Sequence, residues 1–190
     1  MPGQYRSDKS AELGSPADRP GFSAVDEGAP PGPDSVRLLR RDIGAAVAAV
    51  ATTDERGFRG VTVSAFCIVS LNPARLLACV GAASESLAAI QLSGHFALSV
   101  LSDRQEFLAD QLAGRAPAVN PRFNGIKHQL SKLGDPILEE CLVWFSCAVQ
   151  ASNPQGDHTV VYGDIREAGY GSGREPLLYF DGSYRYFQVD

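Results

Sequence analysis

The sequence predicts a mainly β protein whose strands close, or nearly close, into a barrel flanked by three helices. Runs rich in Val, Ile and Thr recur between residues 45 and 187, and short turns separate them. The few helical segments do not alternate with the strands in the β–α–β order of a doubly wound sheet. A closed or nearly closed barrel is favoured, since closure also removes the exposed edges that so many strands would leave.

Composition restricts the classes of function. The 190 residues are 44% hydrophobic and carry a net charge of −5 without a basic cluster, which argues against a nucleic-acid partner. The N-terminus lacks the apolar stretch of a signal peptide, and no window approaches the about 18 apolar residues of a membrane span. The four cysteines form no C-x-x-C pair, so we expect free thiols, three of them in buried strands, and a cytoplasmic protein.

The first 33 residues differ in composition from the rest. They hold six of the twelve prolines and five glycines, with few large apolar residues. Such a segment cannot offset the entropy lost on ordering, so we expect a disordered tail over 1–33 and one folded domain over 34–190. A terminal extension is favoured over a binding motif, since composition alone cannot show recognition.

The N-terminal half of the domain has recognisable element boundaries. Asp34 is expected to cap a short helix with Val36, Leu39 and Ile43 on one face. Three strands follow, over 45–53, 59–71 and 75–81, with a turn at Gly57 between the first two.

Two helices then flank a strand at 95–102. The first helix begins after Ser84 and ends at Gly94, and the second is capped by Ser102 or Asp103 and ends at Gly114. After a proline-containing loop, three further β segments are expected, with hairpin turns at Gly156 and Gly182. These segments cover residues 141–152, 158–168 and 176–187.

The first candidate binding segment is residues 57–66. Gly60 would let the backbone approach a planar ligand, and Thr62 and Ser64 lie two apart, on the same face of a strand. Their hydroxyls and the backbone amides could bond the polar edge of an isoalloxazine ring. From these residues alone, an ordinary edge strand with a polar face remains the favoured interpretation.

The second candidate is the start of the helix after Ser84. Free N–H groups, the helix dipole and the hydroxyls of Ser84 and Ser86 could together hold a phosphate. Plain capping explains Ser84 equally well, and Glu85 would repel a phosphate that it faced.

The third candidate is the turn from Gly156 to Thr159, where His158 could donate to a ligand carbonyl or phosphate. A solvated turn is favoured from the residues alone. His95 and His128 are assigned no role.

Several chemistries lack their sequence motifs. The chain has no G-x-G-x-x-G after the first strand, no Walker loop, no G-x-S-x-G elbow and no Cys/His cluster. A hydrolase or a metal mechanism is therefore disfavoured, and no metal site is predicted.

Taken in order, the segments resemble the flavin reductase family, the small reductase components of two-component flavin-dependent monooxygenases. The resemblance extends from about Ser35 to Phe187 and is carried by the order and spacing of six stretches. These are residues 45–73, 84–114, 122–125 (RFNG), 133–138 (LGDPIL), 156–165 (GDHTVVYGDI) and 176–180 (PLLYF).

This resemblance implies a split β-barrel of the Greek-key, FMN-binding type, usually a homodimer, with FMN or FAD lying across the barrel. It also implies hydride transfer from NADH or NADPH to the flavin and delivery of reduced flavin to a partner monooxygenase. The implied flavin contacts are Thr62, Val63, Ser64, Ala65, Cys79, Val80, Gly81, Ser84, Glu85, Ser86, Gln111 and Leu112. The implied nicotinamide contacts are Gly156, Asp157, His158 and Thr159.

His158 is the implied catalytic residue, either orienting the nicotinamide or helping to supply a proton. Two positions depart from the family pattern: Glu85 stands where a basic or neutral residue is common, and Ala65 where a serine is common. Either departure could shift the preference between FMN and FAD.

Two alternatives stay open from the sequence. One is a split-barrel flavoprotein that holds its flavin tightly and acts directly on an organic substrate, and the other is a flavin carrier without turnover. The sequence also leaves open the flavin, the nicotinamide nucleotide and the identity of the oxygenase.

Overall fold

The computed structural model describes residues 28–116, 123 and 125–187. It divides the chain into two compact units, one of residues 1–44 with 180–183 and one of residues 45–179 with 184–190. Most of the predicted N-terminal tail, residues 1–27, lies outside the described residues.

The described part of the smaller unit contains the helix α1 (Pro33–Arg40). The predicted helix is present, but its predicted cap is wrong: Gly32 is the N-cap, and Asp34 lies in the first turn beside Arg37 at 2.6 Å. Pro33 explains the shift, because its fixed φ and missing N–H suit the first helical position. After the helix, the Arg41 side chain bonds the carbonyl and carboxylate oxygens of Asp181 at 3.1 and 3.2 Å.

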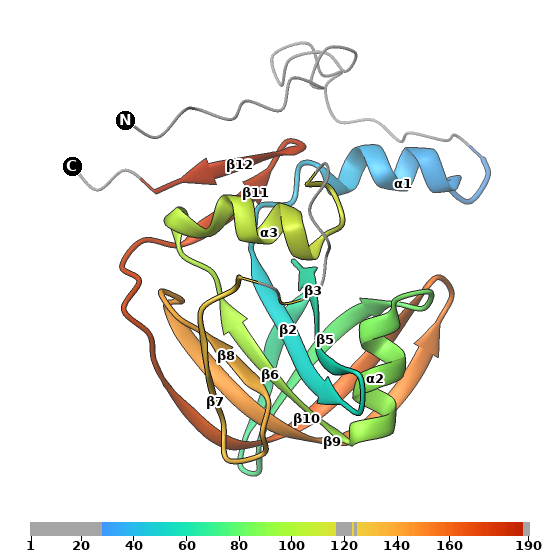
Figure 1. Cartoon of the computed structure of the whole chain (residues 1–190). Coiled ribbons are helices and arrows are strands. Elements are labelled where there is room, and N and C mark those ends of the chain that lie inside the picture. Colours follow the sequence, from blue (N-terminus) through green and yellow to red (C-terminus); the bar gives the residue numbers. More distant parts are fainter. Residues whose placement is uncertain (1–27, 117–122, 124, 188–190) are drawn as a thin grey trace. The chain divides into compact units, whose positions relative to one another are not determined.

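The larger unit is organised by a seven-stranded antiparallel sheet (Figure 1). Its strand order is β3-β2-β6-β9-β10-β5-β4. The strands are β2 (Ala48–Asp54), β3 (Gly57–Val63), β4 (Phe66–Leu71), β5 (Ala74–Gly81), β6 (His95–Val100), β9 (Val143–Gln155) and β10 (His158–Tyr170). The mainly β prediction is confirmed.

This sheet is open between β3 and β4, so of the two expected forms, closed or nearly closed, the barrel is not fully closed. The predicted strand 59–71 breaks at Ser64 and Ala65, after which β4 pairs with β5 and not with β3. Two consecutive segments thus become the two opposite edges of one sheet. An open, or split, barrel follows, as the family resemblance implied.

Five short strands complete the β structure of the described residues. A three-stranded sheet has the order β1-β11-β12, and β7 pairs with β8. Their bounds are β1 (Ala45–Ala46), β7 (His128–Leu130), β8 (Pro136–Leu138), β11 (Leu177–Phe180) and β12 (Ser183–Tyr186). The hairpin β7–β8 was not expected, because its strands are only three residues long and lack a clear alternation.

The helices after β5 and β6 follow the prediction closely. Ser84 caps α2 (Glu85–Ser93), and Gly94 ends it with a left-handed φ of 75°. Ser102 precedes a 3-10 turn (η2, Asp103–Gln105) that leads into α3 (Glu106–Leu112). The Ser102 amide donates to the Gln105 side chain at 3.0 Å, which completes a capping box.

Two apolar clusters hold the larger unit together. One lies between α2 and the sheet and includes Ile90, Phe96 and Leu98 among its fully buried residues. The other includes Leu112 of α3, Phe123 and Leu177. Burial of these side chains from water is the main stabilising contribution.

Candidate active site

The predicted binding segments meet where β5 ends. Gly156 and Asp157 form the β9–β10 turn, and His158, the first residue of β10, stands directly opposite Gly81 in the β10–β5 register. On the other side of β5, the Cys79 amide donates to the Ala65 carbonyl at 2.9 Å. Antiparallel pairing therefore brings residues from three separate stretches within one or two residues of each other along neighbouring strands.

The α2 N-terminus continues directly from this point. The Ser84 amide donates to the Gly81 carbonyl at 3.0 Å, and the Ser84 hydroxyl accepts from the Ser86 amide at 3.2 Å. Ser86 is buried, whereas Glu85 is exposed. The first turn of α2 presents backbone donors and the positive end of the helix dipole beside the end of β5.

The residues of the β3–β4 break differ in what they can offer a ligand. Ser64 is half-buried and Ala65 is exposed, so both lie within reach of the surface. The Thr62 hydroxyl donates to the Ala109 carbonyl of α3 at 2.7 Å, so its proton is engaged within the protein. Val63 packs in the core with its side chain, which leaves only its backbone for a ligand.

Other predicted flavin contacts are also buried. Val80 is fully buried, and Gln111 and Leu112 are nearly so. Packing explains why residue 60 is a glycine, because a Cβ there would lie 2.6 Å from the Phe123 ring and 3.2 Å from Leu112. The predicted close approach of a planar ligand is therefore not needed to explain this glycine.

Cys79 places a neutral thiol beside the same turn. Burial, and secondarily the neighbouring Cys67, raises the pKa of the Cys79 thiol. The thiol therefore stays protonated at neutral pH and adds no negative charge next to the α2 N-terminus. All four cysteines are free, as predicted, although only Cys141 and Cys147 are buried.

His158 lies at the exposed end of the site. Its side chain is 48% exposed, and Nδ1 lies 2.8 Å from Oδ1 of Asp157, whose side chain is 94% exposed. The backbone of this turn is tied to the α2 approach, because the Ala82 amide donates to the Asp157 carbonyl at 2.9 Å. Gly156 adopts a left-handed φ of 62°, and Thr159 is buried. With Nδ1 directed to Asp157, Nε2 is the ring nitrogen that can meet a ligand.

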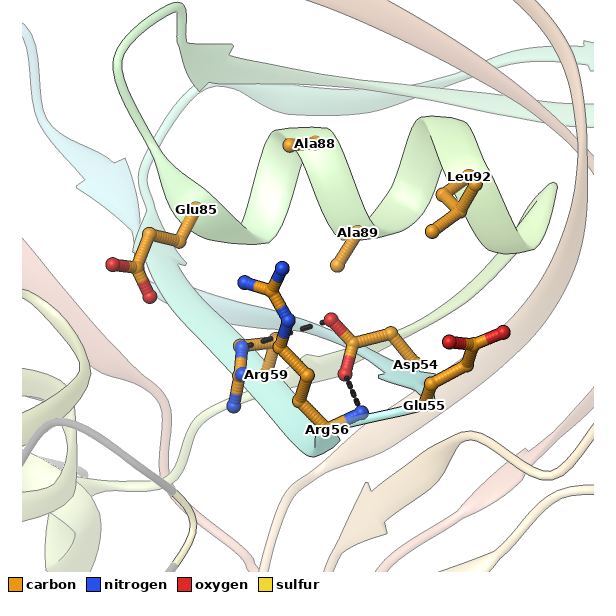
Figure 2. Close-up of a pocket in the computed structure, with 8 residues that line it drawn as sticks. All are labelled: Asp54, Glu55, Arg56, Arg59, Glu85, Ala88, Ala89 and Leu92. Carbon is orange, nitrogen blue, oxygen red and sulfur yellow. Dashed lines mark hydrogen bonds and ion pairs between the residues drawn. The ribbon is translucent and has the colours of Figure 1, made fainter.

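A pocket of about 270 Å³ that the sequence did not reveal lies between the β2–β3 turn and α2 (Figure 2). Its lining residues are Asp54, Glu55, Arg56, Arg59, Glu85, Ala88, Ala89 and Leu92. Arg59 is 8% exposed although it lies on an otherwise apolar strand face with Val61 and Val63. A charged residue at an inward strand position was the signal that could have pointed to this pocket.

A second His–Asp pair lies away from this site. His95 Nδ1 is 2.8 Å from Oδ1 of Asp135, which is fully buried. Burial raises the pKa of the Asp135 carboxyl, although its hydrogen bond with His95 opposes this. The pair joins β6 to the loop before β8.

The described residues contain neither a metal-binding group nor a membrane-spanning helix. No group of three or more His, Cys, Asp or Glu residues in residues 28–116, 123 and 125–187 could hold a metal ion. Among these same residues, no helix has the length and apolar character needed to cross a membrane.

A split antiparallel barrel, with a helix N-terminus and a histidine turn at one strand end, is the arrangement that the family resemblance implied. The chain belongs to the flavin reductase like domain family, whose model matches residues 39–188. This confirms the family resemblance of the sequence.

Individual relatives support this assignment. The chain is 33% identical to a flavin reductase of Pseudomonas putida over 139 residues, covering 73% of this chain and 80% of that protein. It is 31% identical to the flavin-dependent monooxygenase reductase subunit HsaB of Rhodococcus jostii, over 76% of this chain and 72% of that one. The NADH:FAD oxidoreductase SgcE6 of Streptomyces globisporus superposes with a TM-score of 0.78 at 28% identity, covering 90% and 100% of the two chains.

Proposed function

We propose that this chain is an NAD(P)H:flavin oxidoreductase, which transfers a hydride from NADH or NADPH to FAD or FMN. The observation that carries the proposal is the register of β5 with β10, which sets His158 opposite Gly81 and beside the α2 N-terminus. A flavin held at β5 and a nicotinamide held at the β9–β10 turn would then be neighbours.

The residues present fit a flavin. The exposed Ala65 and the half-buried Gly81 lie at the strand end where remaining backbone groups could meet the polar edge of the ring system. The first turn of α2, with Ser84 and Ser86, can donate to the flavin phosphate. When bound, the flavin supplies the hydride-accepting ring, and the chain positions it.

His158 would orient the nicotinamide through Nε2 while Asp157 holds the ring by Nδ1. Hydride transfer needs the two rings to be stacked at close range, and it does not require a strong acid–base pair in the protein. Because His158 is half-exposed, it can also exchange a proton with solvent.

A partner oxygenase would receive the reduced flavin by diffusion or transient contact. Two relatives support this proposal by name: HsaB is the reductase subunit of a flavin-dependent monooxygenase, and BorF is the flavin reductase component of a two-component tryptophan halogenase. Four free cysteines are consistent with a reducing compartment, and we place the enzyme in the cytoplasm.

We also propose a homodimer. The register of β4, β5 and β10 sets Cys67, Leu77 and Tyr162 on one face of the sheet, with Cys79 and Val160 beside them. Cys67 is exposed and the other four are half-buried, which leaves an apolar sheet face that a second copy could cover. Light scattering that gives the mass of a single chain would contradict the dimer.

The test of the main proposal is steady-state oxidation of NADH and NADPH with FAD, FMN or no added flavin. Turnover should depend on added flavin and saturate with it. A purified protein that retains flavin through gel filtration and ignores added flavin would instead indicate a tightly bound prosthetic group. Anaerobic stopped-flow mixing with NADH should bleach the flavin, and a flavin that stays oxidised would indicate a carrier.

A further inference from the structure

The pocket between the β2–β3 turn and α2 begins where the proposed flavin site ends. Glu85, the first residue of α2, lines one end of the pocket, and Leu92, seven residues further along the helix, lines it too. At about 1.5 Å per residue the pocket wall extends about 10 Å along α2. Figure 2 shows Glu85 and Leu92 toward opposite ends of the helix, with Arg56 of the turn and Arg59 of β3 below it.

Arg59 is a buried cation with few partners. Its side chain is about nine-tenths buried, yet among the described residues it makes one 3.3 Å hydrogen bond, to the Phe58 carbonyl, and one ion pair at 3.8 Å, to Asp54. A guanidinium carries five N–H donors, which is more than these two contacts use. Because Arg59 lines the pocket, its other donors can meet acceptor oxygens of a ligand there.

Arg56 adds a second guanidinium at the mouth of the pocket. It lies in the exposed β2–β3 turn, where its amide donates to Asp54 at 2.8 Å. In Figure 2 its side chain extends from the turn toward α2, into the space between Glu85 and Ala89. Two guanidiniums, one fixed by burial and one on the turn, match the oxygens of a phosphate group.

The remaining lining is not that of a simple anion site. Asp54, Glu55 and Glu85 contribute carboxylates, which repel a bare phosphate but accept hydrogen bonds from sugar hydroxyls. Ala88 and Leu92 add an apolar surface along α2. The pocket therefore combines guanidiniums for a phosphate, carboxylates that can accept from ribose hydroxyls, and an apolar wall for a flat base. A ligand that joins these three parts suits it.

We propose that this pocket binds the AMP half of FAD and makes FAD the preferred flavin. The inference rests on the proposed flavin site, since Glu85 lies between the turn that would hold the flavin phosphate and the pocket. Arg56 and Arg59 donate to the adenylate phosphate, a neighbouring carboxylate accepts from the ribose, and the adenine lies along α2. FMN ends at its single phosphate and does not enter the pocket.

The test measures the dissociation constants of FAD and FMN by quenching of flavin fluorescence. Four proteins are compared: the unaltered chain, Arg56→Ala, Arg59→Gln and the control Arg104→Ala, an exposed arginine of η2 outside the pocket. The unaltered chain should bind FAD at least about fivefold more tightly than FMN, and each pocket variant should weaken FAD binding about tenfold. FMN binding should change by less than about twofold in all three variants.

Each other outcome overturns the assignment. Equal weakening of FAD and FMN would place the arginines on the phosphate that both flavins share, and unchanged FAD binding would remove them from the site. The NADH KM, measured with riboflavin as acceptor, should not change; a rise in that KM with FAD binding intact would give the pocket to the nicotinamide nucleotide. Arg56→Ala lies in an exposed turn, so it tests the proposal even if Arg59→Gln does not fold.

Failure of the wider function gives a different result. If FMN binds and is reduced by NADH while the FAD preference is absent, only the AMP pocket is wrong. If neither flavin is reduced, the proposed reductase activity is wrong, whatever the dissociation constants show.

Discussion

Two histidines of this chain make the same local contact in opposite surroundings. His95 and His158 each place Nδ1 2.8 Å from an aspartate oxygen. Asp135, the partner of His95, is fully buried, whereas Asp157, the partner of His158, is 94% exposed. The comparison teaches that the pair geometry alone does not reveal a role: burial makes the first pair a connection within the fold, and exposure leaves the second available to a ligand.

Asp135→Ala should produce the largest effect on stability. It removes the buried acceptor of His95 and leaves a small cavity, so we expect a loss of about 2 to 3 kcal/mol in the free energy of unfolding. Urea denaturation measures this loss. Asp157→Ala is the matched control on the exposed pair and should unfold at the same urea concentration as the unaltered chain, and equal losses would refute the comparison.

His158→Ala should produce the largest effect on activity. We expect kcat/KM for NADH to fall roughly 10- to 100-fold through a poorly oriented nicotinamide, with flavin dissociation constants unchanged. His95→Ala, assayed under conditions in which the variant is folded, should leave kcat/KM for NADH close to that of the unaltered chain. A variant of His158 that loses flavin binding but keeps its NADH kinetics would assign the residue to the flavin.

The buried pair should also impose a pH dependence on stability. Because the pKa of Asp135 is raised in the folded state above its ordinary 3.8, the folded chain favours the protonated carboxyl. The stabilisation that comes from protonating Asp135 is therefore complete below pH 3.8. It is lost as the pH rises through the raised pKa of the folded state. The free energy of unfolding of the unaltered chain, minus that of Asp135→Asn, should fall over this acidic range and then level off. A difference that rises with pH would contradict the raised pKa.

Asp157→Asn should have the smallest effect. The carboxylate is exposed and screened by solvent, so its charge contributes little, and the amide oxygen can still accept from His158. We expect kcat/KM for NADH to fall by less than about threefold, without a change in the urea midpoint. A loss as large as that of His158→Ala would show that the aspartate is itself required for hydride transfer.

Much of the fold was accessible from local sequence features. Ser84 and Gly94 mark the ends of α2, because a capping hydroxyl and a left-handed glycine act on the adjacent backbone only. Gly156 and Gly182 mark the two hairpin turns for the same reason. The Asp34 cap was mispredicted because a proline nearby also satisfies the helix start.

The site was less accessible, because it depends on contacts between distant residues. His95 and Asp135 are 40 residues apart, and neither lies in a motif that pairs them. Arg59 received no role from the sequence, because its burial follows from the position of α2 over β3. Thr62 looked available to a ligand until its hydroxyl was found bonded to α3.

The sequence by itself determined the ends of α2, the hairpin turns, the mainly β class and, through the order of its segments, membership in the flavin reductase family. Only the tertiary structure decided that the opening of the sheet lies between β3 and β4 and that His158 stands opposite Gly81. It also decided which of two similar histidine pairs is buried. The physical reason is range: caps and turns are set by hydrogen bonds between near neighbours in the chain, whereas register, burial and pockets arise when distant segments pack together.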